Sequence, residues 1–175
     1  MQPSDPVILV PYDPCWPRRF EEERGVLDEV FTGVPVRIEH IGSTAVPGLG
    51  AKPIIDILLG VGRIREVEER IPLLESRGYE YIPKWESVLP ERRFFAKPRA
   101  VPRTHHLHCV ETRTEFWRRH LLFRDLLRDD AALTRAYHRL KLELAGRYRD
   151  DREAYTDAKT AFIESVLRDA AGQRI

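Results

Sequence analysis

The spacing of apolar side chains divides the chain into a first part of strands and turns and a second part of helices. Up to about Glu111, short apolar runs alternate with turns that contain proline and glycine. Alternation of apolar and polar residues over 34–41 predicts a half-buried strand, and the nearly continuous apolar run over 54–61 predicts a buried central strand. Three more strands are predicted over 79–82, 92–96 and 105–110.

Helical periodicity accounts for most of the remaining chain. In the first part, helices are predicted over 16–31 and over about 64–74, where Pro72 predicts a kink or an early end. In the second part, the periodicity predicts three helices, near 114–128, 131–148 and 152–170.

The resulting fold class is α+β, with a mixed sheet of about five strands and two helices, followed by a C-terminal three-helix segment. Its length of 175 residues suits a single domain over 1–175, made of an α/β part (1–111) and a helical part (112–175). At the start of the last helix, Asp150 and Glu153 resemble an acidic capping box.

Charge and composition restrict the classes of function. With 29 basic and 28 acidic residues, the net charge of +1 argues against a general nucleic-acid binder but leaves room for a local basic pocket. Cys15 and Cys109 have no CxxC spacing, which indicates neither a zinc module nor a disulfide framework. No apolar run approaches the roughly 18–20 residues that span a bilayer, so we expect a cytoplasmic protein without membrane contact.

The segment HIGSTAVPGLGAKPIIDILLGV (40–61) has the composition of a phosphate-binding turn followed by an acidic strand. Gly42 lets the backbone approach a ligand closely, and Ser43 and Thr44 can offer hydroxyl and N–H groups to a phosphate. Asp56 lies in an apolar strand, where a carboxylate needs a partner, a proton or a cation such as Mg²⁺. The alternative is that the turn is only a turn and that Asp56 binds a neighbouring backbone group or lysine.

Two histidines share one face of a later predicted strand. His106 and His108 are two residues apart, so they can share a metal ion, or supply a general base and a phosphate donor. They can equally be half-exposed residues that make hydrogen bonds at a sheet edge.

Basic residues form a third set of candidates. Lys141 and Lys159 lie within the apolar stripes of two predicted helices, from which they can converge on a triphosphate, snorkel to solvent or pair with an acid such as Asp56. Arg124 can clamp a phosphate or form a surface ion pair, and Lys52 can neutralise ligand charge or remain solvated.

Several of these motifs together resemble the GrpB-like family of bacterial proteins. The resemblance covers almost the whole chain and rests on PYDPCWPRRFEEE (11–23), HIGSTAVPGL, KPIIDI, HHLHCV, FRDLLR and the Tyr-x-x-x-Lys pairs at 137–141 and 155–159. That family looks like a branch of the nucleotidyltransferase superfamily with the DNA polymerase beta-like catalytic fold. The resemblance therefore implies a nucleotidyltransferase-like mixed sheet.

One position departs from the superfamily pattern, which has a Gly-Ser turn and then a strand with two carboxylates separated by one residue. Gly42, Ser43 and Asp56 match this pattern, but Leu58 occupies the position of the second acid. The paired carboxylates help to hold two metal ions, so their reduction to one weakens the inference of catalysis and leaves nucleotide binding possible.

The leading hypothesis is a nucleotidyltransferase that binds a nucleoside triphosphate with Mg²⁺ and transfers a nucleotidyl group to an unidentified acceptor. Asp56 would hold the metal, with His106 or His108 as base or auxiliary ligand. The alternatives are a non-catalytic nucleotide- or coenzyme-binding module and a histidine-metal phosphohydrolase. The expected partner is a small nucleotide or another phosphorylated ligand. Phosphate would bind to Gly42, Ser43, Thr44, Lys52, Arg124, Lys141 and Lys159.

Overall fold

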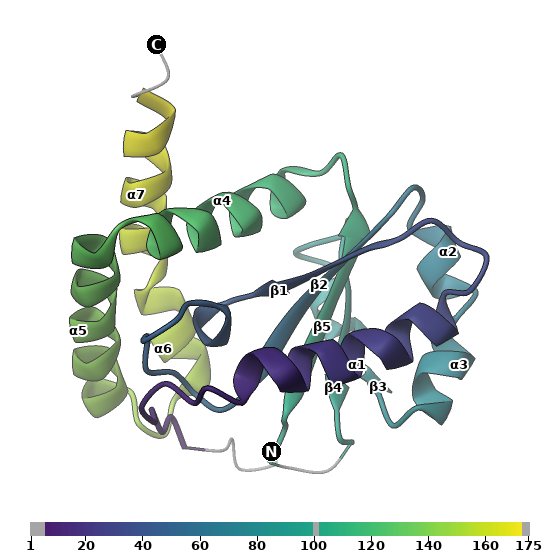
Figure 1. Cartoon of the computed structure of the whole chain (residues 1–175), viewed down its shortest axis with the longest axis horizontal. Helices are drawn as coiled ribbons and strands as arrows, with labels where there is room; N and C mark the ends of the chain where they lie inside the picture. Colours follow the sequence, from purple (N-terminus) through teal and green to yellow (C-terminus); the bar gives the residue numbers. More distant parts are fainter. Residues whose placement is uncertain (1–5, 100–101, 173–175) are drawn as a thin grey trace.

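A five-stranded mixed sheet runs through the computed structural model, which describes residues 6–99 and 102–172 (Figure 1). The strands are β1 (Arg37–Ile41), β2 (Ile55–Val61), β3 (Glu80–Tyr81), β4 (Arg93–Lys97) and β5 (His105–Glu111). Their order is β1-β2-β5-β4-β3, with β2 and β5 parallel and the other neighbours antiparallel. The predicted mixed sheet of five strands is confirmed, with some strands shorter than expected.

Helix α1 (Trp16–Val30) lies along one face of the sheet, and the short helices α2 (Arg65–Glu68) and α3 (Ile71–Ser76) stand near one end (Figure 1). The main core forms on this face, where Phe20 and Leu27 of α1 pack in one cluster with Ile57 and Leu107 of the central strands. The single helix predicted over 64–74 is two helices. Pro72 lies in the first turn of α3, where its missing N–H breaks no helical hydrogen bond.

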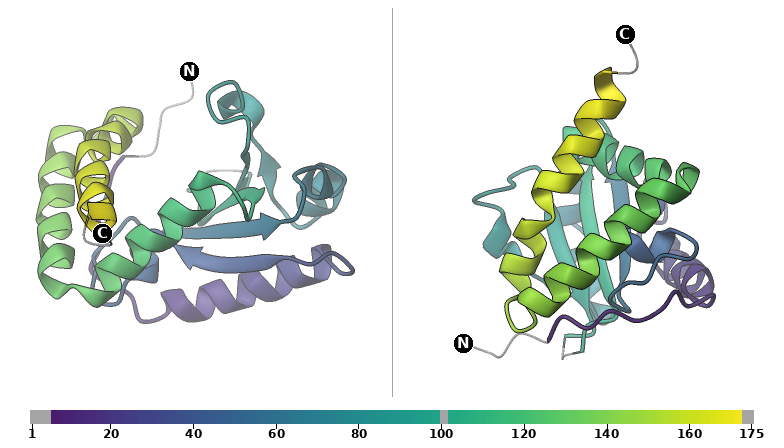
Figure 2. Two further views of the ribbon diagram at one scale, coloured as in Figure 1. Left: turned by 90° about the horizontal axis from the view of Figure 1, so that it is seen from above. Right: turned by 90° about the vertical axis from the view of Figure 1, so that its left-hand side faces the viewer.

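Helix α4 (Glu115–Asp129) crosses the opposite face (Figure 2). It begins at Thr114, whose side chain accepts from the backbone amide of Trp117. Trp117 packs on Leu58 and Val110, and a Cβ atom on Gly60 would lie 2.5 Å from its ring. The absence of a side chain at Gly60 is therefore what allows α4 to approach the sheet.

The remaining helices, α5 (Ala131–Arg147), α6 (Arg152–Ala158) and α7 (Thr160–Gly172), stand at the end of the sheet where β2 begins (Figures 1 and 2). The prediction of three C-terminal helices is wrong in number, because the helix expected over 152–170 is interrupted at Lys159. There the backbone amide bonds to the carbonyl of Thr156 in a tighter turn.

Asp151, and not Asp150, caps α6. Its carboxylate accepts from the backbone amide of Ala154 at 2.9 Å. Between α4 and α5, Asp130 caps the second helix in the same way and so separates the two. No helix of the described residues is both long and apolar enough to cross a bilayer.

Candidate functional site

A tight turn after β1 brings the backbone against Asp56 near the start of β2. Gly42 has a φ of 71° and a ψ of −172°, a conformation that is essentially restricted to glycine. A Cβ atom on Gly42 would lie 2.6 Å from Oδ2 of Asp56. The turn and the carboxylate are thus in direct contact, and no side chain fits between them.

The two hydroxyl groups of this turn have different surroundings. Thr44 is 1% exposed, and its Oγ1 donates to the carbonyl of Ile54 (3.3 Å) and accepts from Nε2 of His40 (2.9 Å). Burial lowers the pKa of His40 to about 4, so the ring is neutral. Oγ of Ser43 instead lies 3.0 Å from Nζ of Lys141 in α5. Of the two hydroxyls expected to bind phosphate, the structure leaves only that of Ser43 next to the basic side chains.

The parallel pairing of β2 with β5 sets His106 beside Asp56 and His108 beside Leu58. Nδ1 of His106 lies 3.1 Å from Oδ1 of Asp56, and Nε2 of His108 lies 3.9 Å from the same oxygen. Burial acts to raise the pKa of Asp56, but the hydrogen bond from His106 and the nearby ring of His108 outweigh it and hold this pKa well below its usual range. The Asp56 side chain is 30% exposed, so its charged carboxylate can be reached from solvent.

An arginine stands behind each histidine. Nη2 of Arg152 lies 3.3 Å from Nε2 of His106, and Nη1 of Arg92 lies 3.3 Å from Nδ1 of His108. A guanidinium group only donates, so the imidazole nitrogen that faces it must accept, and a neutral ring carries its proton on the other nitrogen. Burial lowers the pKa of His108 to about 4, which keeps that ring neutral. Both rings therefore direct an N–H group toward Asp56.

These donors decide whether the site fits the magnesium ion expected from the sequence. One ligand atom from each of Asp56, His106 and His108 lies within 4.8 Å of the others, which is close enough to share an ion. Magnesium prefers oxygen ligands, however, and only Asp56 offers one. A metal-binding histidine also donates its second N–H to an acceptor behind it, whereas the groups behind these two rings are donors. The residues do not fit a magnesium ion held by the protein.

Three lysines lie near one another beside the turn, and they come from the helices and from the loop before β2. Lys141 is 2% exposed and donates to Oγ of Ser43 and to the carbonyl of Gly50 (2.5 Å). Nζ of Lys52 and of Lys159 lie 5.3 and 4.3 Å from the ring centroid of Tyr155. Burial, together with repulsion between these cations, lowers the pKa of Lys52 and of Lys141 to about 7. Burial lowers that of Lys159 to about 8, although Asp56 opposes this.

These groups form the Asp56 cluster: Gly42, Ser43, Lys52, Asp56, His106, His108, Lys141, Arg152 and Lys159. Its charges are unbalanced. Within the described part of the chain, no carboxylate oxygen lies within 4.0 Å of the charged nitrogens of its lysines or of Arg152. The cluster therefore suits an anionic ligand better than a cation.

Lysine is rare in this chain but concentrated in the Asp56 cluster. The chain contains 24 arginines and only five lysines, and three of the five belong to the Asp56 cluster. An ammonium group is a compact charge whose pKa can fall on burial, whereas a guanidinium stays protonated. The cluster thus uses the cation whose charge can change near neutral pH.

Arg124, which the sequence placed among the phosphate-binding residues, has other partners. Its guanidinium lies 2.8 Å from Glu39, 2.7 Å from Asp125 and 3.1 Å from the carbonyl of His40. These bonds fix α4 to β1, and the structure does not place Arg124 in the Asp56 cluster.

Sequence reasoning missed Arg92, Arg152 and His120. His120 lies beside His108, with ring centroids 6.4 Å apart, and burial lowers its pKa. Arg152 had a usable signal, since it shares one helical face with Tyr155 and Lys159 at a spacing of three and four residues. Arg92 had none, because its position beside His108 depends on how β4 pairs with β5.

Comparison with known proteins places this site in a family. The family model described as GrpB protein matches residues 6–169. The chain belongs to the GrpB family. The glutamate-rich protein GrpB of Alkalihalophilus pseudofirmus is 34% identical over 167 residues, which are 93% of this chain and 95% of that protein.

Solved structures agree with this assignment. The crystal structure of the conserved protein GrpB from Enterococcus faecalis has a TM-score of 0.85 and 38% identity, over 95% of this chain and 99% of that one. The Cid1 poly(U) polymerase has a TM-score of 0.50 with 14% identity, over 81% of this chain and 48% of that one. This second likeness concerns the fold alone, and it confirms the expected nucleotidyltransferase-like arrangement of sheet and helices.

Proposed function

We propose that this GrpB-family chain binds the phosphate groups of a nucleotide at the Asp56 cluster. The observation that carries the proposal is the surplus of positive charge: three lysines and Arg152 lie near one another, Asp56 is the one carboxylate that acts on Lys52 and Lys159, and none of the four cations has a carboxylate oxygen within 4.0 Å among the described residues. Partly desolvated like charges destabilise a protein, so their presence at one place calls for a ligand. Phosphate oxygens would supply both the missing charge and the acceptors.

The exposure of each cation separates two roles. Lys52, Lys159 and Arg152 are partly exposed and can touch phosphate oxygens directly. Lys141 is buried beneath the turn, so it would act through Ser43, whose hydroxyl it positions. The carboxylate of Asp56, kept anionic by two imidazole N–H groups, would set the orientation of the ligand by repelling its phosphates. No step of this proposal requires a metal ion held by the protein.

Urea denaturation with and without ATP tests the proposal. Lys159→Met keeps the apolar stem and removes the charge, and Lys84→Met removes the same charge from a side chain that is 60% exposed. The unfolded-state pKa of lysine is near 10.4, so holding Lys159 protonated in the fold costs up to about 3 kcal/mol. We expect Lys159→Met to raise the free energy of unfolding without ATP and to lose most of the stabilisation by ATP.

The control variant Lys84→Met should change the free energy of unfolding, and its increase by ATP, by less than about 0.5 kcal/mol each. Tripolyphosphate, added in place of ATP, shows how much of the stabilisation comes from the phosphates alone. If Lys159→Met is stabilised by ATP as strongly as the unchanged chain, the Asp56 cluster is not the phosphate site and the proposal fails.

Nucleotidyl transfer is a second candidate, favoured by the contact between the Gly42-Ser43 turn and Asp56 in a fold similar to that of a poly(U) polymerase. In this reaction an acceptor hydroxyl forms a bond to the α-phosphorus while the bond to the pyrophosphate oxygen breaks. Leu58 weighs against it, since this residue is fully buried against Val110 and Trp117 where a second acid would be needed. If the chain releases pyrophosphate from ATP and Asp56→Asn abolishes this release, transfer is supported. If ATP binds and no pyrophosphate is released, the chain is a binding module.

A further inference from the structure

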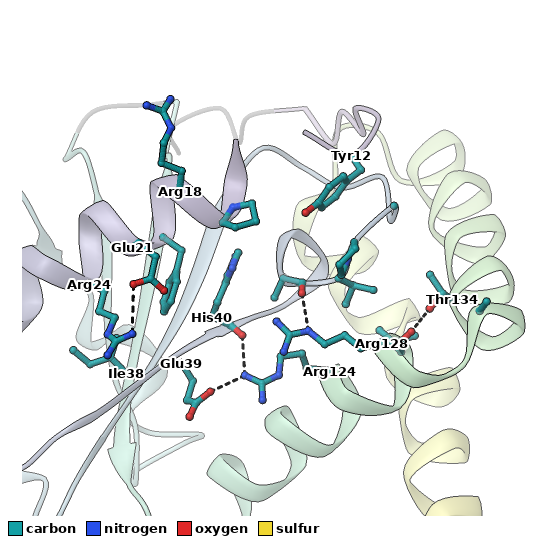
Figure 3. Close-up of a pocket in the computed structure, with 18 of the residues that line it drawn as sticks. Tyr12, Arg18, Glu21, Arg24, Ile38, Glu39, His40, Arg124, Arg128 and Thr134 are labelled. Atoms are coloured by element: carbon teal, nitrogen blue, oxygen red, sulfur yellow. Dashed lines mark hydrogen bonds and ion pairs between the residues drawn. The ribbon is translucent and has the colours of Figure 1, made fainter. Parts of the chain in front are cut away.

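A cavity of about 960 Å³ lies apart from the Asp56 cluster, between α1, β1, the 45–48 loop and the junction of α4 with α5 (Figure 3). None of Asp56, the two histidines or the three lysines lines it. Its volume is within the range of roughly 300–1,000 Å³ that is usual for small-molecule sites. The nucleotide proposal leaves this cavity without a role.

Five arginines and two glutamates line the cavity, so its charge is also unbalanced. Arg24 lies 3.4 Å from Glu21, and Arg124 lies 2.8 Å from Glu39 (Figure 3). Both glutamates of the lining are thus already paired with arginines of the same lining. Any further arginine must find its counter-ion elsewhere.

Arg18 pairs with Glu22 outside the lining at 3.5 Å, which leaves Arg128 and Arg135. Nε of Arg128 donates to the carbonyl of Ala45 at 2.9 Å, which holds its guanidinium at the cavity wall. Its nearest carboxylate is Asp125, 3.9 Å from Nη1, and that carboxylate already binds Arg124 at 2.7 Å. Arg135 is exposed, and in residues 6–99 and 102–172 it has no carboxylate within 4.0 Å. Two cations of the lining therefore have N–H groups available to a ligand.

Part of the remaining lining is apolar. Tyr12, Pro17 and Pro47 line the cavity and are at least partly exposed. Tyr12 stands above Arg128 in the close-up (Figure 3). Tyrosine and proline rings offer flat apolar surfaces with little side-chain entropy to lose.

We propose that this cavity binds a small molecule with a phosphate or carboxylate group on a planar apolar body. The oxyanion accepts hydrogen bonds from Arg128 and Arg135, and the planar body lies against Tyr12, Pro17 and Pro47. Charge-assisted hydrogen bonds from two arginines fix the anionic end, and the apolar walls select the remainder of the ligand. This site is independent of the Asp56 cluster and of its proposed nucleotide.

Titration of the ¹⁵N-labelled chain with phenyl phosphate and, separately, with benzoate tests the proposal. We expect saturable binding of at least one probe, with amide shifts at Tyr12 and Val46, and the stronger probe identifies the oxyanion. The Arg128→Gln/Arg135→Gln variant should bind at least about tenfold more weakly. Arg18→Gln, at another lining arginine that is exposed and paired with Glu22, and Lys159→Met should bind as the unchanged chain does.

Three results would overturn the proposal: no saturable binding of either probe, undiminished binding in the double variant, or loss of binding in Lys159→Met. Should the double variant not fold, Arg135→Gln alone changes only an exposed side chain and must still weaken binding. Inorganic phosphate is the last arm of the experiment. If it binds as tightly as phenyl phosphate, the planar apolar body is not recognised and that part of the proposal is wrong.

Discussion

Replacement of Gly42 by alanine perturbs the contact on which the Asp56 cluster is built. The added Cβ atom would lie 2.6 Å from Oδ2, 3.1 Å from Cβ and 3.2 Å from Cγ of Asp56. The first distance is well inside van der Waals contact, so either the turn or the carboxylate must move. Because Asp56 is also hydrogen-bonded to His106 at 3.1 Å, the carboxylate cannot move without strain on that bond.

The loss of unfolding free energy expected for Gly42→Ala has two parts. An alanine at the φ and ψ of Gly42 costs on the order of 1–3 kcal/mol of backbone strain. The steric overlap adds about 1–3 kcal/mol, as overpacking does in a filled interior. Gly48 separates the two parts, since its φ is also positive, at 77°, but a Cβ atom there would meet nothing within 4 Å. We therefore expect Gly42→Ala to lose about 2–6 kcal/mol of unfolding free energy and Gly48→Ala only the backbone part.

Urea denaturation of the two variants measures this difference directly. A double-mutant cycle tests whether the overlap with Asp56 causes the loss. Asp56→Ala removes the oxygen at 2.6 Å and leaves only the Cβ contact at 3.1 Å. Gly42→Ala should then cost less in the Asp56→Ala background than alone. Equal losses for Gly42→Ala and Gly48→Ala, or a cycle without coupling, would refute the reasoning.

The other predictions concern charge. Burial lowers the pKa of His40 and of His108 from 6.5 to about 4, so the unfolded chain binds more protons between these values and stability falls as the pH drops through this window. Denaturation at pH 7 and pH 5 should show a loss of about 2 kcal/mol per histidine, and His40→Gln should remove its share. Elemental analysis of the purified chain should find no stoichiometric metal. Arg152→Gln can present an acceptor to His106, so this variant should bind zinc more tightly. Stoichiometric zinc in the unchanged chain would contradict the tautomers deduced above. Finally, an anion favours protonated Lys52, Lys141 and Lys159, so ATP affinity should fall as the pH rises through 7 to 8, and calorimetry in buffers of different ionisation enthalpy should detect proton uptake.

The elements that the sequence predicts well are those whose signal is local. The continuous apolar run of β2 and the periodicity of α4 and α5 lie within one or two residues of the predicted bounds. The interruption at Lys159 was missed because the helical periodicity of Tyr155, Lys159 and Phe162 continues across it. The cap at Asp151 was assigned to Asp150 because neighbouring acids cannot be told apart by composition alone.

The site was predictable to the extent that strand alternation fixes which side chains share a face. That rule puts His106 with His108, and Asp56 with Leu58, before any pairing is known. Pairing itself decides that Asp56 lies beside His106, and nothing local encodes the register of β2 on β5. For Arg124 the sequence predicted a contact that the structure does not show. An arginine is a common phosphate-binding residue, and only the structure reveals that Glu39 is its partner.

The sign of the local charge is what separates this site from a two-carboxylate site that holds metal ions. A pair of acids creates a negative site that attracts divalent cations, and the substrate phosphates then follow the metal. Here Leu58 removes one acid, two imidazole N–H groups satisfy the other, and lysines and an arginine outnumber it. Such a site can attract phosphate directly, because side chains of α5, α6 and the loop before β2 carry the positive charge that metal ions would otherwise supply.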